Sequence, residues 1–242
     1  MSRSCPSQKA AGTAKTIAAA TASHIMCRTS IRPNIAVAMS PHHEQGGLFE
    51  APQELPQGLV YEPNFLTQDE EDGLLAHITP LPLREAKFRE YFAKRRVAHF
   101  HDGPHAPRYD DGDADSFSSG PLPPFLAALR EKVARRLELA PADFVHVLVS
   151  EYRPGTPIGW HRDRPEYGIV VGISLAGVGR MRWRPYAHQD AQHTVTLDLA
   201  RRSMYVMRGP IRWQWQHSMP PMRELRYSIT MRTRAAPGER EF

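Results

Sequence analysis

From residue 144 onward, the chain consists of short strand-like segments separated by turn residues, and several of these segments alternate polar and apolar side chains. Residues 194–199, Thr-Val-Thr-Leu-Asp-Leu, are one example, bounded by polar residues. Alternation places every second side chain on the same face of a strand, so it predicts half-buried strands. The candidate strands, each bounded by Gly, Pro or polar residues, are 144–152, 168–176, 179–184, 193–199, 203–208, 211–217 and 225–232. A series of short strands predicts an antiparallel sandwich or barrel.

Two helical patterns precede these strands. Residues 67–78 begin with Thr67, a good N-cap residue, and carry acidic residues in the first turn. Residues 122–138 start at a Pro-Pro pair and repeat apolar residues at helical spacing, namely Phe125, Leu126, Leu129, Val133 and Leu137. Residues 101–120 are rich in Asp, Gly, Pro and Ser and predict a loop. Helices followed by strands indicate an α+β fold.

The first 50 residues differ from the rest of the chain. They are rich in Ala, Ser, Thr and Pro, show no sustained periodicity and contain both cysteines, Cys5 and Cys27. We interpret residues 1–50 as a disordered tail and residues 51–242 as one domain. The tail is a non-structural extension, a product of an upstream start site, or an organelle transit peptide. We expect a cytoplasmic protein, or an organellar one if residues 1–43 are a transit peptide.

Charge is distributed unevenly along the chain. The net charge of +5 equals the five basic residues of segment 1–43, which has no acidic residue. Residues 44–143 contain 11 basic and 18 acidic residues, whereas residues 144–242 contain 15 basic residues, all Arg, and 8 acidic ones. Arg pairs with carboxylates and phosphates through two parallel hydrogen bonds, so the second half indicates an anionic partner. No apolar run approaches the roughly 18 residues that a membrane helix needs, so we expect no membrane partner.

The triplet His161-Arg-Asp163 brings one imidazole and one carboxylate to the same face of an extended segment. The triplet alone is a weak signal, because His188-Gln-Asp190 repeats it in a polar stretch that predicts an exposed turn. His217 lies downstream at the end of an apolar and aromatic segment. Two His and one carboxylate form a facial triad that suits Fe(II) and oxygen chemistry, with catalytic zinc as the alternative.

The segment 226–232 has an unusual distribution of charge for a strand. Arg226, Ser228, Thr230 and Arg232 would share one face, and Tyr227, Ile229 and Met231 the other. Two Arg on the inner face of a small barrel are costly unless an anion meets them. A dicarboxylate would supply that anion; the alternative is a solvated strand face.

Together these residues resemble the AlkB-like family of Fe(II)- and 2-oxoglutarate-dependent dioxygenases. The H-x-D…H…R-x5-R pattern of the family is matched in order by His161, Asp163, His217, Arg226 and Arg232. Further matches are Val147–Tyr152, which leads into Gly159-Trp-His161, and Met181-Arg-Trp-Arg184. Lys94–Phe100 corresponds to a basic and aromatic segment on the substrate side. The resemblance covers about residues 58–234.

The resemblance implies a double-stranded β-helix, or jelly roll, with N-terminal helices packed on it. It implies that His161, Asp163 and His217 bind Fe(II) and perform catalysis with 2-oxoglutarate and O2. Arg226 would pair with the distal carboxylate of 2-oxoglutarate, aided by Tyr152, with Arg232 near its other end and Ser228 on the same strand face. Where the family has Asn, this chain has Ser150, which still donates a hydrogen bond but has a shorter reach.

The resemblance also implies oxidative demethylation of alkylated bases in DNA or RNA, with release of formaldehyde, succinate and CO2, and hence a role in DNA repair. Where repair members of the family often have an acid, this chain has Pro165, a departure that concerns the substrate rather than the type of reaction. The alternatives are the same chemistry on a protein or a small molecule, or a non-catalytic jelly-roll binding module. We expect a monomer.

Several residues are candidates for contact with a nucleic acid. Arg180, Arg182 and Arg184 share one strand face, with Trp183 between them, and Arg95 belongs to a basic cluster near Phe100. Phosphates would meet the Arg, and an extruded base would stack on an aromatic ring. The alternatives are a core position for Trp183 and a solvated face for the cluster. The predicted substrate residues are therefore Arg95, Phe100, Arg182, Trp183 and Arg184.

Overall fold

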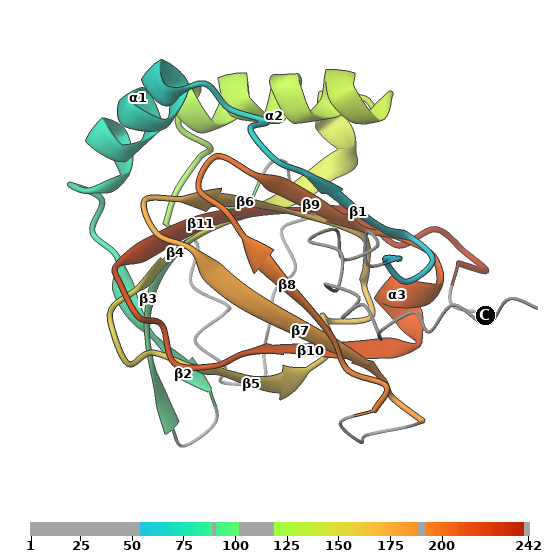
Figure 1. The fold of residues 1–242 in the computed structure, drawn as a ribbon. Coiled ribbons are helices and arrows are strands. Elements are labelled where there is room, and N and C mark those ends of the chain that lie inside the picture. The colour runs from blue at the N-terminus through green and yellow to red at the C-terminus, as the bar shows by residue number, and fades with distance from the viewer. Residues whose placement is uncertain (1–53, 89–90, 102–118, 188–191, 240–242) are drawn as a thin grey trace, which may run out of the picture. The chain divides into compact units, whose positions relative to one another are not determined.

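Two antiparallel sheets face each other in the computed structural model (Figure 1). The structure describes residues 54–88, 91–101, 119–187 and 192–239, all within one compact unit, Ala51–Phe242. The larger sheet has the strand order β1 (Leu59–Glu62), β9 (Met204–Met207), β6 (Tyr167–Leu175), β11 (Arg226–Arg234), β4 (Phe144–Tyr152), β3 (Tyr91–His101) and β2 (Arg84–Phe88). The smaller sheet has the order β5 (Ile158–His161), β10 (Trp215–Met219), β7 (Gly179–Pro185) and β8 (Val195–Leu199).

Two helices cover the outer face of the larger sheet (Figure 1). Helix α1 (Gln68–Ile78) starts at a capping box, in which the Thr67 hydroxyl accepts from the Glu70 amide and the Glu70 carboxylate accepts from the Thr67 amide. Helix α2 (Pro124–Leu137) ends at Glu138, which adopts a left-handed conformation. Both helices begin within one or two residues of their predicted start.

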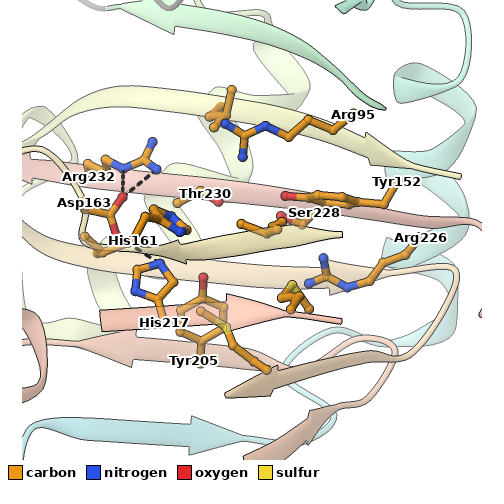
Figure 2. Close-up of a pocket in the computed structure, with 15 residues that line it drawn as sticks. Arg95, Tyr152, His161, Asp163, Tyr205, His217, Arg226, Ser228, Thr230 and Arg232 are labelled. Carbon is orange, nitrogen blue, oxygen red and sulfur yellow. Dashed lines mark hydrogen bonds and ion pairs between the residues drawn. The ribbon is translucent and has the colours of Figure 1, made fainter. Parts of the chain in front are cut away.

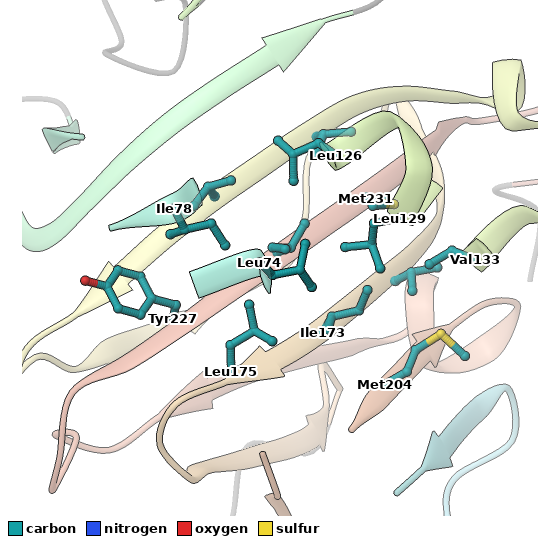
Figure 3. Close-up of a cluster of buried hydrophobic side chains, with 14 of the residues drawn as sticks. Leu74, Ile78, Leu126, Leu129, Val133, Ile173, Leu175, Met204, Tyr227 and Met231 are labelled. Atoms are coloured by element: carbon teal, nitrogen blue, oxygen red, sulfur yellow. The ribbon is translucent and has the colours of Figure 1, made fainter. Parts of the chain in front are cut away.

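The core beneath the helices follows from the alternation in the strands. Leu74 and Ile78 of α1 and Leu126, Leu129 and Val133 of α2 pack onto the sheet (Figure 3). The sheet contributes the alternate residues of its strands, including Ile173, Leu175, Met204, Tyr227 and Met231. The remaining residues of each strand therefore point between the sheets, where the polar side chains of β11 lie.

The strand predictions hold for six of the seven segments and fail in part of one. Segment 211–217 was expected to be a strand, but Pro210–Trp213 form a short helix, α3, and the strand β10 begins only at Trp215. Gly209 has a positive φ of 60° and Pro210 follows it at the first helical position, which starts a helical turn. Strands β1, β2, β3 and β5 were not predicted.

The predicted loop 101–120 and the predicted tail 1–50 lie almost wholly outside the described residues. The boundary of the domain near residue 50 therefore stays a prediction. Within the described part of the chain, no helix has the length and apolar character needed to span a membrane.

Candidate metal and cofactor site

A pocket between the two sheets gathers polar side chains from both (Figure 2). Strands β3, β4, β6, β9 and β11 of the larger sheet and β5, β7 and β10 of the smaller sheet contribute to it. Its lining consists of Arg95, Leu148, Tyr152, Ile158, His161, Asp163, Val170, Met181, Tyr205, His217, Met219, Arg226, Ser228, Thr230 and Arg232. The sequence signals at residues 161–163, 217 and 226–232 thus converge on one pocket.

The two histidines are brought together by the pairing of β5 with β10. His161 and His217 are direct partners in the register of these strands, and their ring centroids lie 4.3 Å apart. Nδ1 of His161 lies 2.9 Å from the carbonyl oxygen of Gly159, which can only accept, so Nδ1 carries the proton. The lone pair of His161 is therefore on Nε2. Burial lowers the pKa of His217 to about 3, so its imidazole is neutral and also offers a lone pair.

Asp163 completes the triad from the segment after β5. Its Oδ2 lies 3.6 Å from Nε2 of His217, and its Oδ1 accepts from Nε and Nη2 of Arg232 at 3.0 and 2.8 Å. Burial alone would raise the pKa of Asp163, but the charge of the Arg232 guanidinium holds it well below its usual range. The carboxylate is thus ionised with one oxygen directed toward the histidines.

Arg226 lies toward the other end of the pocket (Figure 2). Its side chain is 2% exposed, and its Nε donates to the Ser174 hydroxyl at 3.0 Å. Its guanidinium carbon lies 5.4 Å from the centre of the Tyr152 ring. No carboxylate among the described residues pairs with Arg226. A buried cation without a counterion is costly, so this end of the pocket fits an anionic ligand.

The residues of the pocket fit iron and a dicarboxylate. Two neutral imidazoles and one carboxylate are the donor set of a facial triad, which leaves other positions of the metal open. Two ligand atoms about 2.1 Å from one ion and at right angles to each other lie about 3 Å apart, so the 3.6 Å between Asp163 and His217 needs little closure. Tyr152 fits the carboxylate end. Burial alone would raise its pKa, but Arg95 and Arg226 lower it overall.

The other predicted cofactor residues lie on the same strand faces. Ser228 is buried and lines the pocket, and Arg232 lies at the metal end. Ser150 is fully buried and pairs with Ser228 across β4 and β11, but it is not part of the lining. Tyr205 was not predicted as a site residue; it lines the pocket and packs its ring against Gly172 of the neighbouring strand. The alternation of residues 204–207 was the available signal, since Tyr205 is the one polar-tipped residue between apolar ones.

The predicted substrate residues separate into two groups. Arg182 and Arg184 lie on the outer face of β7, where their guanidinium carbons are 5.2 and 4.0 Å from the centre of the Trp160 ring. Arg162 lies over Tyr186 at 4.1 Å. We call these residues, Trp160, Arg162, Arg182, Arg184 and Tyr186, the outer cationic–aromatic surface. Trp160 and Arg162 flank His161 in sequence and were not predicted as contacts.

Two predicted substrate residues are buried instead. Trp183 is 0% exposed, and its Nε1 donates to the sulfur of Met207. Phe100 is 3% exposed and packs in the core beneath the helices. Their apolar positions in the strand alternation explain this burial, and neither can stack on a base in this structure. Arg95 lines the pocket rather than the outside. His188 and Asp190 lie outside the described residues.

The sequence matches a family model described as the 2OG-Fe(II) oxygenase superfamily over residues 58–234. It is 29% identical over 99 residues to uncharacterized protein L905 of Acanthamoeba polyphaga mimivirus, a match that covers 36% of this chain and 46% of that protein. It is 28% identical over 172 residues to mouse (Mus musculus) tRNA (carboxymethyluridine(34)-5-O)-methyltransferase ALKBH8, covering 69% of this chain and 25% of that protein. The chain thus spans less than half the length of either relative.

Solved structures share the fold at low sequence identity. The structure of OsALKBH1 has a TM-score of 0.57 at 16% identity and covers 75% of this chain and 100% of that one. A prolyl hydroxylase from Trichoplax adhaerens, in complex with a hypoxia inducible factor peptide fragment, has a TM-score of 0.52 at 13% identity, covering 76% and 86%. These likenesses confirm the expected double-stranded β-helix, and the match to ALKBH8 confirms the AlkB-like resemblance.

Proposed function

The chain belongs to the 2OG-Fe(II) oxygenase superfamily, and we propose that it demethylates alkylated bases in DNA or RNA. In this reaction one atom of O2 oxidises 2-oxoglutarate to succinate and CO2, and the other hydroxylates an N-methyl carbon of the base. The hydroxymethyl group then leaves as formaldehyde. The observation that carries the chemistry is the presence, in one pocket, of the proposed metal-ligand triad and of Arg226, a buried cation that pairs with no carboxylate among the described residues.

The side chains at one end of the pocket would bind the metal, and those at the other end would bind 2-oxoglutarate. His161, Asp163 and His217 would hold Fe(II), which supplies O2 activation when it is bound. Arg226 would bind the distal carboxylate of 2-oxoglutarate, with Tyr152 beside it. Arg232 keeps Asp163 ionised and oriented through two hydrogen bonds to one of its oxygens. Burial raises the pKa of Tyr205, so its hydroxyl stays protonated and can donate a hydrogen bond into the pocket.

The outer cationic–aromatic surface supports a nucleic-acid substrate. Its guanidinium groups can contact phosphates, and its aromatic rings can contact bases. Trp160 and Arg162 are the immediate neighbours of the metal ligand His161, so an anionic strand on this surface would run beside the site. The name of the relative ALKBH8 states a tRNA activity for that protein. These observations favour a nucleic acid over other substrates.

The test is formaldehyde release from methylated oligonucleotides in the presence of Fe(II) and 2-oxoglutarate. Single- and double-stranded DNA and RNA are supplied separately, and His161→Ala serves as the inactive control. We expect release from at least one substrate and none from the variant. If the wild-type protein binds metal and converts 2-oxoglutarate but all oligonucleotides stay methylated, the substrate proposal is wrong.

The same oxygenase chemistry on a protein or small molecule is the second candidate, favoured by Pro165 at a position where repair members of the family often have an acid. The salt dependence of DNA or RNA binding distinguishes the two candidate functions. Binding through phosphates releases counterions and therefore weakens steeply as salt rises. A substrate other than a nucleic acid predicts 2-oxoglutarate turnover without salt-dependent binding of DNA or RNA.

A further inference from the structure

A row of side chains crosses the larger sheet at the metal end of the pocket. Arg232 of β11 is the direct partner of His146 on β4, and His146 is the direct partner of His101 on β3. His99 lies on the same face of β3 as His101, two residues away. His146 is 4% exposed and stacks on Tyr167 with ring centroids 5.3 Å apart. None of the three histidines belongs to the metal-ligand triad.

Arg232 connects this row to the triad. It uses Nε and Nη2 on Oδ1 of Asp163, and its Nη1 lies 3.0 Å from Nδ1 of His146. A guanidinium is always protonated and can only donate, so Nδ1 of His146 must accept. The proton of the neutral imidazole is then on Nε2, which lies 3.1 Å from Nδ1 of His99 and donates to it. The direction of each hydrogen bond from Arg232 to His99 is therefore fixed.

The three histidines could also be considered as a second metal site. One ring nitrogen of each lies within 4.8 Å of the others, and Nδ1 of His101 is buried with no hydrogen-bond partner among the described residues. The hydrogen-bond directions oppose this interpretation. A metal on Nε2 of His146 would move the proton to Nδ1, where it would face an N–H of Arg232. The contact between His146 and His99 is therefore a hydrogen bond rather than a pair of ligands.

The charge state of His146 agrees with its role as an acceptor. Burial lowers the pKa of His146 well below its usual value, and the charge of Arg232 lowers it further. Asp163 and Arg232 are nearly buried as well, at 6% and 13% side-chain exposure. A buried N–H of Arg232 without an acceptor would favour rotation of the guanidinium toward another acceptor, and this rotation would release Oδ1 of Asp163.

We propose that His146 is a positioning residue for the metal ligand Asp163. By accepting from Nη1 of Arg232, it fixes the guanidinium so that Nε and Nη2 hold Oδ1 and leave Oδ2 for the metal. The inference rests on the proposed function, because it takes Asp163 as an iron ligand. Partners that orient metal ligands typically change metal affinity about 10- to 100-fold when they are removed.

The test is a titration of the metal-free full-length protein with Co(II), followed by its visible absorption, which reports metal binding without turnover. His146→Asn keeps an acceptor at the δ position of the side chain, whereas His146→Leu has similar volume and no acceptor. His146→Gln is polar but carries its amide one carbon further out. We expect the Leu and Gln variants to bind Co(II) about 10-fold more weakly, and the Asn variant to bind like the wild type.

Three outcomes would overturn the inference. The first is equal Co(II) affinity in the wild type and the Leu and Gln variants, and the second is equal weakening in the Asn variant. The third is a second bound Co(II) that is lost on His99→Leu, which would make the cluster a metal site. If thermal unfolding shows that the Leu variant is not folded, the comparison of the Gln variant with the Asn variant tests the inference. Absence of wild-type binding, or binding unchanged by His161→Ala, would instead contradict the proposed function.

Discussion

Arg226 and Arg232 lie on the same face of the same strand, six residues apart, yet their surroundings differ. Arg232 has a carboxylate partner in Asp163, whereas Arg226 donates to the neutral hydroxyl of Ser174. The sequence alone indicates two inward cations. The structure adds that one is already neutralised and one is not, and this difference separates the metal end of the pocket from the end that binds an anion.

Replacing Arg226 with Gln should weaken 2-oxoglutarate binding selectively. A hydrogen bond to a charged group contributes about 1.5–3 kcal/mol, so we expect the KM for 2-oxoglutarate to rise roughly 10- to 100-fold. Co(II) affinity should not change, because Arg226 does not contact the triad. Arg226→Lys keeps the positive charge, so its KM for 2-oxoglutarate should rise less than that of Arg226→Gln. An equal loss of metal and 2-oxoglutarate binding would show that Arg226 acts through the fold instead.

Gly179 lies against the Arg226 side chain and allows its position. A Cβ at Gly179 would lie 2.6 Å from Nε of Arg226 and 2.5 Å from Cε of Met219, closer than such atoms approach. Overpacking of this kind costs about 1–3 kcal/mol, so Gly179→Ala should raise the KM for 2-oxoglutarate by about 10-fold.

The matched control for this glycine is Gly73→Ala. Gly73 lies within α1 and its added Cβ would meet no atom within 4 Å. Alanine should leave the KM unchanged and raise the free energy of unfolding by about 0.5–1 kcal/mol, as expected inside a helix. If both substitutions change the KM alike, the close approach of Gly179 to Arg226 has no role.

The helices and most strands could be predicted because their signals are local. Caps, Pro starts and apolar spacing mark α1 and α2, and alternation marks β7, β8 and β11. The contacts between elements could not be predicted. Glu71 of α1 is fully buried and accepts from the amide of Ala176, after β6, and from Arg201, after β8. Nothing in the sequence around Glu71 identifies residues more than a hundred positions away as its partners.

The stability of the protein should depend on pH through Glu71. Burial alone would raise the pKa of Glu71, but the hydrogen bonds from Arg201 and from the Ala176 amide lower it overall from 4.5. A lowered pKa in the folded state stabilises the protein above about pH 4.5, and this contribution is lost as pH falls through the folded-state pKa. Glu71→Gln should therefore lower the free energy of unfolding at pH 7 by about 1.5–3 kcal/mol.

Urea unfolding at pH 7 and near pH 4 measures this contribution. The difference between wild type and Glu71→Gln should begin to shrink near pH 4. There the Glu71 carboxyl of the unfolded wild type takes up a proton, while the folded state, with its lowered pKa, keeps the charge. The exposed neighbour Asp72, substituted by Asn, serves as the control and should show a small difference at both pH values. If the difference in unfolding free energy between the wild type and Glu71→Gln does not depend on pH, Glu71 stabilises the protein through packing rather than through its charge.

At the scale of the whole molecule, the distribution of charge is more informative than its sum. The Arg-rich half, residues 144–242, contains all three predicted iron ligands and all five residues of the outer cationic–aromatic surface. The sequence identified Arg182 and Arg184 as a pair on one face. It could not identify their partner Trp160, because pairing across β5, β10 and β7 decides which side chains meet.

Removing residues 1–43 should show whether nucleic-acid binding depends on the basic N-terminal segment or on the Arg-rich half, residues 144–242. This segment has five basic residues and no acidic one, and the remaining residues have 26 of each. All proposed ligands lie after residue 150, so Co(II) affinity and 2-oxoglutarate turnover should match those of the full-length chain. If the segment contacts nucleic acid, the slope of log affinity against log salt should become shallower by about 0.7–0.9 for each phosphate contact that is lost.

The double substitution Arg182→Gln with Arg184→Gln in the full-length chain is the matched comparison. It removes two positive charges beside the site, so it should reduce formaldehyde release from methylated oligonucleotides and make the salt slope shallower by up to about 1.4–1.8. Formaldehyde release should be unchanged by removal of residues 1–43 at a salt concentration where tail contacts are screened. If the truncated chain loses release while the double variant keeps it, the substrate contacts lie in residues 1–43 and not on the outer cationic–aromatic surface.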